Sequence, residues 1–332
     1  MILFKKTYPL WQTNVFYAIM KHRQRRQLDR ALGLYAVLAI ICVILVALSP
    51  GNCGSGTPVV LRYGVYSFWI SLHDPDGDRV VSKEIKETMQ YSSVQELHAV
   101  CALPYVRCNS GRQFVEVGSA VGMVGLYAAS RGMRVMAFDP LQPNVQRLKE
   151  SLCLNCRTFT QWDKCANFHS DRFSVHQNLV GAQPDTVGRS VQSEPHNLAA
   201  TMRGGGSVVT DNVTTVTIDQ SVGGPIELLL LTCQGAEYEA LLGASLHLAA
   251  RKINNVIWRR HHAGPEYDVK ATQIVHLLWS SGFHFFYDLE GSRGEGSQPR
   301  LFLSDKAVLE YVNRQRAPGE HPNILASMGV LG

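Results

Sequence analysis

Residues 114–140 contain the side chains and the spacing best suited to chemistry. Glu116 lies near the end of a short apolar run, Gly118 and Gly122 follow it, and Asp139 comes 21 residues after Gly118. Glycine in a strand-to-helix turn lets the backbone approach a ligand closely, and a carboxylate ending the next strand can accept hydrogen bonds from ribose hydroxyls. The segment therefore predicts a site for a ligand that contains a nucleoside.

The glycine spacing discriminates between two such ligands. A dinucleotide site requires Gly-x-Gly-x-x-Gly, so that backbone N–H groups reach a pyrophosphate. Here the second glycine, Gly122, comes four positions after Gly118, and the carboxylate of Glu116 would repel a phosphate. The same carboxylate suits the ammonium and sulfonium of S-adenosylmethionine. The pattern thus favours S-adenosylmethionine over NAD, and a glycine turn without any ligand is the third alternative.

From residue 113 onward, short apolar runs alternate with helical patterns. Strands are expected at residues 113–117, 134–138, 173–180, 226–232, 255–258 and 283–287, with a last strand at 300–304. Helices are expected at residues 121–130, 144–152, 237–250 and 269–281. Such alternation predicts an α/β fold with a parallel sheet and helices on both faces. The run IELLLLT has no polar alternation, as is typical of a strand covered on both faces.

Four segments in this order resemble the FkbM-type family of S-adenosylmethionine-dependent O-methyltransferases: EVGSAVGMVGLYAA, RVMAFDPLQPN, TVTID and QGAEYEALLGA. The resemblance covers about residues 110–290. It implies a class I methyltransferase (Rossmann-like) fold with a seven-stranded, mostly parallel sheet, and S-adenosylmethionine as cofactor. By position it implies six cofactor-binding residues: Glu116, Gly118, Ser119 and Gly122 around the methionine part, Asp139 at the ribose, and Asn144 at the start of the next helix.

The chain also departs from the family pattern. The family's fourth strand normally ends in Asp-x-Glu-Gly-Ala-Glu, whereas this chain has Thr232 and Gln234 at the first two acidic positions and keeps only Glu237. These changes fall at the carboxyl ends of strands, where such sheets bind ligands. Two functions stay open: an O-methyltransferase, and a catalytically degenerate protein that keeps the fold as a binding or scaffold module.

Methylation of a hydroxyl requires a group that takes the hydroxyl proton. His261 and His262 follow the fifth strand of the fold, and imidazole titrates near neutral pH, so either is a candidate general base. The alternative is that both are exposed loop residues. Glu237 is the third catalytic candidate, either orienting the acceptor or capping the helix that begins beside it.

An uncharged apolar run predicts a membrane anchor. Residues 31–48 carry no charge, and as a helix they would extend roughly 27 Å, close to the thickness of a bilayer core. Residues 1–30 carry seven Lys or Arg and one Asp. Their place beside the apolar run indicates a cytosolic flank rather than a nucleic-acid site, and we expect no nucleic-acid partner. A cleavable signal peptide is the rival interpretation.

This orientation predicts a single-pass type II membrane protein of the Golgi or endoplasmic reticulum, with a lumenal C-terminal domain. The acceptor would then be a glycan or another hydroxyl of the secretory pathway. Seven cysteines follow the apolar run, which suits disulfides in an oxidising compartment. Cys153, Cys156 and Cys165 could instead supply three zinc ligands, but no fourth ligand falls at standard spacing, so we expect disulfides or buried thiols and no metal. Asn212 begins a glycosylation sequon.

The chain divides into six predicted parts. They are a basic cytosolic tail (1–30), a transmembrane signal anchor (31–49), a stem (50–58), a lead-in segment (59–110), a methyltransferase-like domain (111–305) with a flexible insertion at about 183–212, and a C-terminal tail (306–332).

Overall fold

The computed structural model describes residues 53–109, 111–158, 166–194, 197–202, 210–259, 265–290, 299–302, 304–314 and 323–329. The tail predicted at residues 1–30 and the anchor predicted at residues 31–49 lie outside these ranges. Within the described ranges, no helix has the length and apolar character needed to cross a bilayer.

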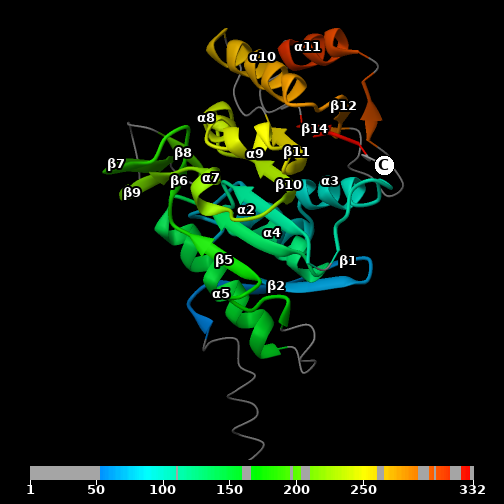
Figure 1. Cartoon of the computed structure of the whole chain (residues 1–332). Coiled ribbons are helices and arrows are strands. Elements are labelled where there is room, and N and C mark those ends of the chain that lie inside the picture. Colours follow the sequence, from blue (N-terminus) through cyan, green and yellow to red (C-terminus); the bar gives the residue numbers. More distant parts are fainter. Residues whose placement is uncertain are drawn as a thin grey trace, which may run out of the picture. The chain divides into compact units, whose positions relative to one another are not determined.

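The described part begins with two strands and two helices, after which strands and helices alternate (Figure 1). The strands are β1 (Thr57–Tyr63), β2 (Tyr66–Leu72), β3 (Gln113–Val117), β4 (Arg134–Phe138), β5 (Phe173–His176), β6 (Leu179–Val180), β7 (Asp185–Glu194), β8 (Asn197–Met202), β9 (Thr210–Val216), β10 (Ile226–Leu231), β11 (Ile253–Arg259), β12 (Phe285–Asp288), β13 (Arg300–Leu301) and β14 (Asn323–Ser327). The helices are α2 (Val81–Thr88), α3 (Ser92–Val100), α4 (Met123–Ser130), α5 (Gln142–Thr158), α7 (Ile218–Ser221), α8 (Glu237–Leu242), α9 (Ser245–Ala249), α10 (Pro265–Ser280) and α11 (Asp305–Asn313).

The main sheet has the strand order β13-β12-β14-β11-β10-β3-β4-β5. Strands β5, β4, β3, β10 and β11 run parallel, and β14 lies antiparallel between β11 and β12. The mostly parallel sheet expected from the sequence is confirmed. The described sheet has eight strands instead of seven, because the two-residue strand β13 extends the edge beside β12.

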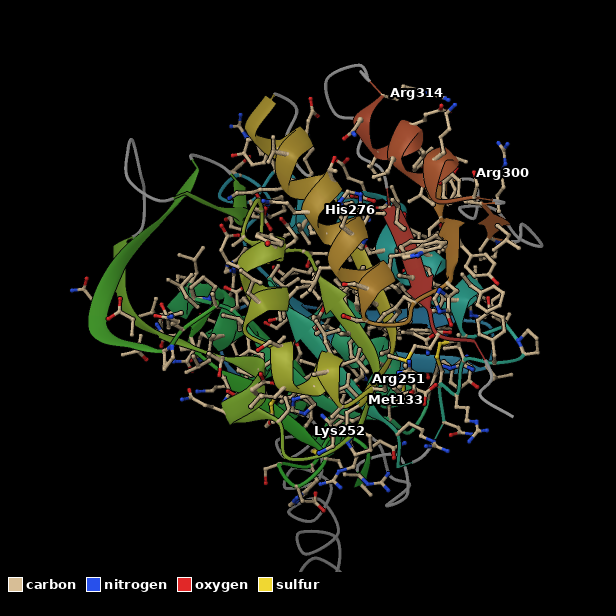
Figure 2. The ribbon with its side chains drawn as sticks, turned by 45° about the horizontal axis from the view of Figure 1, so that its top comes forward. Met133, Arg251, Lys252, His276, Arg300 and Arg314 are labelled. Carbon is tan, nitrogen blue, oxygen red and sulfur yellow. A yellow bond between two sulfur atoms is a disulfide. The ribbon has the colours of Figure 1, made fainter. Side chains whose placement is uncertain are left out.

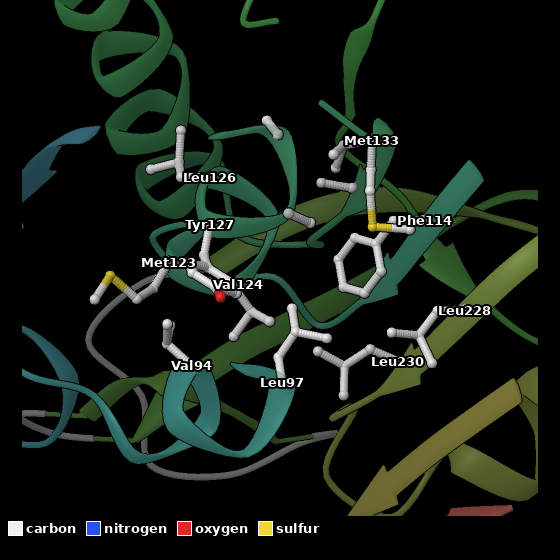
Figure 3. Close-up of a cluster of buried hydrophobic side chains, with 14 of the residues drawn as sticks. Val94, Leu97, Phe114, Met123, Val124, Leu126, Tyr127, Met133, Leu228 and Leu230 are labelled. Carbon is white, nitrogen blue, oxygen red and sulfur yellow. The ribbon is translucent and has the colours of Figure 1, made fainter. Parts of the chain in front are cut away.

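Alternate residues of the central strands face two separate cores. Along β10, Leu228 and Leu230 pack into one core, and Leu229 and Leu231 into the other. Figure 3 shows the first core, where α3 and α4 contribute Val94, Leu97, Met123, Val124, Leu126 and Tyr127 against β3 and β10. Helices α8–α11 cover the opposite face (Figure 1). An uninterrupted apolar run is what a strand between two cores requires.

The sheet has two functionally different edges. Met133 directly precedes β4, and Arg251 and Lys252 directly precede β11; all three are labelled in Figure 2. They lie at the amino-terminal edge. The carboxyl ends of β3, β4, β10 and β11 meet at the opposite edge, where open α/β sheets bind ligands.

The described part of the predicted stem, residues 53–58, is tied to the domain. Cys53 forms a disulfide with Cys153 of α5, and the N–H groups of Ser55 and Gly56 donate to the carboxylate of Glu150 (3.3 Å each). The hairpin β1–β2 then packs along α5. The segment from Cys53 onward therefore belongs to the domain that follows it.

The cysteines form two disulfides, and one of these uses a suggested zinc ligand. Besides the first disulfide, Cys101 is bonded to Cys108. Because Cys153 is bonded to Cys53, it is not available as one of the three suggested zinc ligands. Cys165 lies outside the described residues.

Two predicted boundaries need correction. The region 183–212, expected as a flexible insertion, contains β7, β8 and the start of β9, which form a second sheet with the order β6-β9-β7-β8. The region 306–332, expected as a tail, contains most of α11 and the whole of β14. Since β14 lies inside the main sheet, the domain continues beyond residue 305 to at least Ser327.

Candidate functional site

The turn after β3 holds the chain close to the end of β10. Gly118 and Gly122 have φ angles of +85° and +81°, and Ala120 has +47°. A Cβ added at Gly118 would lie 2.5 Å from the carbonyl oxygen of Thr232. Glycine is required at this position both by the left-handed backbone and by the close approach of the two chains.

Backbone N–H groups of this turn are directed at the end of β4. Those of Gly118 and Ser119 donate to the carbonyl oxygen of Phe138 (2.9 and 3.0 Å), and that of Ala120 donates to Asp139 Oδ2 (2.7 Å). These three donors are therefore engaged inside the protein, and they do not form a cradle for a pyrophosphate.

Asp139 and Asn144 lie behind the turn as a supporting pair. Asp139 is 3% exposed, and its Oδ1 accepts from Leu141 N–H and Asn144 Nδ2 (3.0 Å each). Asn144 Oδ1 lies 3.0 Å from His73 Nε2, so this histidine nitrogen donates. The sequence correctly places Asp139 at a strand end beside the turn, but the carboxylate already holds the loop in place.

His176 is a neighbour that the sequence did not single out. It ends β5, its carbonyl oxygen accepts from Asp139 N–H (3.1 Å), and its ring stacks on Phe138 with centroids 5.0 Å apart. Its Nε2 is buried without a hydrogen-bond partner in the described structure, and burial lowers the pKa of the imidazole. The ring is therefore neutral at physiological pH and lies next to the predicted ribose acid.

A pocket of about 480 Å³, part of it open to solvent, lies at the carboxyl edge of the sheet between the turn and the start of α3. We call it the glycine-turn pocket. Of the predicted cofactor residues, Glu116, Gly118 and Ser119 line it, whereas Gly122, Asp139 and Asn144 do not. Three further lining residues come from the ends of other strands: Thr232, Gln234 and Arg259.

Glu116 brings a carboxyl group into this pocket. It is 2% exposed, and its Oε2 accepts from Gly125 N–H (3.1 Å) in the first turn of α4. Burial, reinforced by the neighbouring Asp139 carboxylate, raises the pKa of Glu116 well above its usual range. Burial therefore favours the neutral form of this carboxyl, whereas a cation in the pocket would favour its ionised form.

Ser119 carries an unsatisfied polar atom. The residue is 4% exposed and lines the pocket, yet its Oγ has no hydrogen-bond partner among the described residues. An unpaired buried hydroxyl costs about 1–3 kcal/mol. A polar group of a ligand in the pocket would remove that cost.

Arg259 is held on the far wall by a buried network. Its Nη2 donates to Ser93 Oγ (2.8 Å) and Glu96 Oε2 (3.0 Å), and its Nε donates to Asn323 Oδ1. Glu96 is distant in the sequence and lies on α3, so only the folded chain shows that this arginine is paired.

Glu237 lies on the other face of the sheet from the glycine-turn pocket. It lines a second, shallow pocket together with Trp258 of β11 and Lys270 of α10, where about 290 Å³ of empty space includes space open to solvent. Its Oε2 accepts from Gly235 N–H (2.8 Å), and burial raises its pKa to about 7. The bond to Gly235 joins Glu237 to the turn that precedes α8. The predicted bases His261 and His262 lie outside the described residues.

The sequence matches the model of one protein family. The model of the methyltransferase FkbM domain matches residues 116–285, which is more than half of the sequence. The chain belongs to the FkbM methyltransferase family. It is thus a methyltransferase, and the resemblance inferred from the four sequence segments is confirmed.

Solved structures that match this chain are distant from it in sequence. A methyltransferase FkbM from Methylobacillus flagellatus is 17% identical with a TM-score of 0.37, and the match covers 65% of this chain and 43% of that one. The 16S rRNA N2 G1207 methyltransferase of T. thermophilus, in complex with AdoMet and guanosine, is 12% identical with a TM-score of 0.38, and the match covers 82% and 51%. This methyltransferase therefore spans only about half the length of those relatives. Curated protein sequences provide no match.

Proposed function

We propose that this methyltransferase uses S-adenosylmethionine and transfers its methyl group to a hydroxyl of a glycan or another secretory-pathway molecule. The observation that carries the proposal is the glycine-turn pocket, which is lined by the buried Glu116 and by Ser119, whose hydroxyl has no hydrogen-bond partner among the described residues. The cofactor's ammonium would favour ionised Glu116, and its polar atoms would satisfy Ser119 Oγ. The residues present therefore fit this cofactor.

The same geometry supports S-adenosylmethionine over a dinucleotide. The N–H groups of Gly118, Ser119 and Ala120 are bonded to the end of β4, so a pyrophosphate would find no donors there. The carboxylate of Glu116 would also repel the phosphate charge. Asp139 would bind the ribose only after exchanging part of its present bonding, and His176 lies next to it.

The protein's contribution to the reaction is positioning and proton removal. When bound, the cofactor supplies a methyl group on a sulfonium, which needs in-line approach of the acceptor oxygen. Thr232, Gln234 and Arg259 form the wall at the strand ends, where such an acceptor would lie. We propose that His261 or His262, which follow Arg259 in the sequence, accepts the hydroxyl proton.

Binding of the cofactor is tested by titrating S-adenosylmethionine into the full chain, with NAD as the comparison. We expect micromolar affinity for S-adenosylmethionine and none for NAD. Ser119→Ala should weaken binding about three- to tenfold, the worth of one neutral hydrogen bond. It should leave the stability of the free protein unchanged or raised, since the hydroxyl has no partner there. Equal affinity in Ser119→Ala would place the cofactor elsewhere.

Catalysis is tested by transfer of labelled methyl groups to monosaccharides and glycan acceptors. His261→Ala or His262→Ala should lower turnover about 10²–10⁴-fold, the usual effect of losing a general base, with cofactor affinity unchanged. Transfer that neither histidine affects would overturn the base assignment. Cofactor binding without any transfer would favour the binding-module alternative, for which the neutral Thr232 and Gln234 are the argument.

We also propose that residues 31–49 anchor the chain in a Golgi or endoplasmic reticulum membrane with the methyltransferase domain in the lumen. The uncharged run, its basic flank and two disulfides in the domain support this placement. The chain should resist carbonate extraction, and vesicles should protect residues 53–332 from protease. Asn212, which is exposed, should carry a glycan that Asn212→Gln abolishes. Release by carbonate would contradict the anchor.

A further inference from the structure

Arg259, which lines the glycine-turn pocket, has one unused edge on its guanidinium. Its side chain is 15% exposed. Its Nη2 donates to Ser93 Oγ (2.8 Å) and Glu96 Oε2 (3.0 Å), and its Nε donates to Asn323 Oδ1. Its Nη1 carries two further N–H groups and has no hydrogen-bond partner among the described residues. Because the other two nitrogens are occupied, Nη1 is the edge that is left for a ligand.

Glu96 and Asn323 support this arginine from outside the lining of the glycine-turn pocket. Both line a smaller adjoining pocket, to which Arg259 also contributes. Asn323 Nδ2 donates to Glu96 Oε1 (2.7 Å), so the two residues that bind Arg259 also bind each other. The guanidinium is thus held in place before a ligand arrives, and binding would cost little side-chain entropy. The two residues come from α3 and β14, which lie outside the segment 116–285 matched by the family model.

The charges of the pocket wall favour an anionic group at this edge. Among the described lining residues, only Arg259 and Glu116 have basic or acidic side chains, and burial favours the neutral form of Glu116. The family resemblance implies acids where this chain has Thr232 and Gln234, and either acid would repel an anion bound at Arg259. Glu96 balances the charge of Arg259, but it occupies Nη2, so Nη1 still offers charge-assisted hydrogen bonds.

The sheet order separates Arg259 from the proposed cofactor residues. Arg259 ends β11, Glu116 lies in β3, Asp139 follows β4, and β10 lies between β11 and β3. Neighbouring strands are about 4.8 Å apart, so the ends of β11 and β3 are separated by roughly 10 Å. With the ribose near Asp139 and the methionine part near Glu116, a group bound at Arg259 lies on the acceptor side of the site.

We propose that Arg259 binds a carboxylate of the methyl acceptor through Nη1, and that Glu96 is its positioning residue. This inference rests on the proposed methyl transfer and narrows its substrate class to acidic hydroxyl compounds, such as the uronic acids of glycans. The carboxylate accepts from Nη1, while the rest of the acceptor extends toward the solvent to which the pocket opens. The neutral Thr232 and Gln234 then belong to this specificity and are not a sign of lost catalysis.

The test compares sugars that differ only at carbon 6. D-glucuronate is paired with D-glucose and D-galacturonate with D-galactose, and each is offered to the full chain with methyl-labelled S-adenosylmethionine. Equilibrium binding of the same sugars to the chain saturated with S-adenosylhomocysteine is measured by calorimetry. We expect at least one acid to exceed its neutral partner about tenfold or more in affinity and in kcat/KM, the effect of a charge-assisted hydrogen bond. Equal values within both pairs, or binding of neither acid, would overturn the proposal.

Two variants test the role of Arg259. Gln234→Glu restores an acid to the pocket wall with little change in side-chain size, and should lower affinity for the acidic sugar about tenfold or more, with the neutral partner within about twofold. Arg259→Lys keeps the charge but cannot make the three present bonds and also offer a free edge, so it should abolish the same preference. Arg134→Lys, at the exposed start of β4, is the matched control and should leave the preference unchanged.

Glu96→Gln tests positioning, because the two possible effects have opposite signs. If Glu96 holds the guanidinium in place, its loss should lower affinity for the acidic sugar about threefold or more and leave the neutral sugar unaffected. If Glu96 acted only as a competing negative charge, its removal would raise affinity for the acid. A rise would therefore overturn the positioning role.

The remaining outcomes separate this inference from the proposed function. If the variants weaken binding of S-adenosylmethionine and spare the sugars, the carboxylate at Arg259 is that of the cofactor and the acceptor role is overturned. Selective binding of the acid without any methyl transfer would refute the proposed function and leave the carboxylate site standing. Should urea unfolding show that Arg259→Lys does not fold, Gln234→Glu decides: an equal loss for acidic and neutral sugars would overturn the proposal.

Discussion

At the scale of single residues, the buried carboxyls Glu116, Asp139 and Glu237 have three different environments. Asp139 accepts hydrogen bonds from Ala120 N–H, Leu141 N–H and Asn144 Nδ2, whereas burial is the first cause of the raised pKa values of Glu116 and Glu237. A buried carboxyl with few donors favours its neutral form. These differences determine what each residue does to stability and to ligand charge.

Glu237 should make stability depend on pH. Its pKa is about 7 in the folded chain against 4.5 for the unperturbed group, so its contribution is fully present below about pH 4.5 and is lost as pH rises through 7. Glu237→Gln should gain stability relative to the natural chain by on the order of 3 kcal/mol between pH 4.5 and pH 8. Urea unfolding across this range measures the gain, and a pH-independent difference would contradict the assignment.

Asp139→Ala should destabilise the free protein as well as weaken cofactor binding. It leaves Ala120 N–H, Leu141 N–H and Asn144 Nδ2 without their acceptor. Hydrogen bonds to a charged group contribute about 1.5–3 kcal/mol each, so we expect a loss of about 3 kcal/mol or more in urea unfolding. Asp171→Ala is the control, because the Asp171 side chain is 77% exposed, and it should stay within about 0.5 kcal/mol.

At the scale of elements, the β3–α4 turn depends on its contact with the end of β10. Thr232 Oγ1 donates to Gly118 O (2.9 Å), and Thr232 N–H donates to Val117 O (2.9 Å). Thr232 thereby connects the ends of β3 and β10 by hydrogen bonds. The family resemblance implies an acid at this position, whereas threonine is neutral. The turn is a shared structure of both strands rather than a free loop.

Gly118→Ala should disrupt this junction. The added Cβ would lie 2.5 Å from Thr232 O, a backbone atom that cannot move without shifting β10, and φ of +85° is unfavourable for alanine. We expect a loss of at least about 2 kcal/mol in unfolding free energy. Gly224→Ala, where a Cβ meets no atom within 4 Å, should change stability by less than about 0.5 kcal/mol. Similar effects at both glycines would refute the close-approach argument.

At the scale of the whole molecule, two disulfides close loops of very different length. Cys53 and Cys153 are 100 residues apart, and Cys101 and Cys108 are seven apart. The first joins the segment before β1 to α5, which packs on β2. Constraint of the unfolded chain grows with the logarithm of loop length.

Removing the disulfide between Cys53 and Cys153 should therefore lower the unfolding free energy more than removing the one between Cys101 and Cys108. In the chain-entropy model the two loops differ by about 2 kcal/mol. Replacing Cys53 and Cys153 by serine should lower the unfolding free energy by about that amount more than replacing Cys101 and Cys108, measured by thermal and urea unfolding. An equal or reversed order would show that native packing, and not loop closure, dominates at these sites.

The sequence by itself determined the elements whose signals are local. The apolar runs 113–117 and 134–138 coincide with β3 and β4, and the run 226–232 contains β10, because burial on both faces leaves continuous apolar stretches. The glycine spacing after β3 likewise predicted the tight turn, since positive φ is a property of single residues.

Only the tertiary structure decided features that depend on distant pairing. The placement of β14 between β11 and β12, the two disulfide partners, and the bond from Arg259 to Glu96 join segments far apart in the sequence, for which a local pattern carries no signal. The position of Glu237 also had to come from the structure. Strand alternation places Leu230 and Leu231 on opposite faces of the sheet, but Glu237 lies beyond the strand, and the fold of the following turn determines which pocket it lines. Burial is a property of the assembled cores, so the raised pKa values of Glu116 and Glu237 also had to come from the structure.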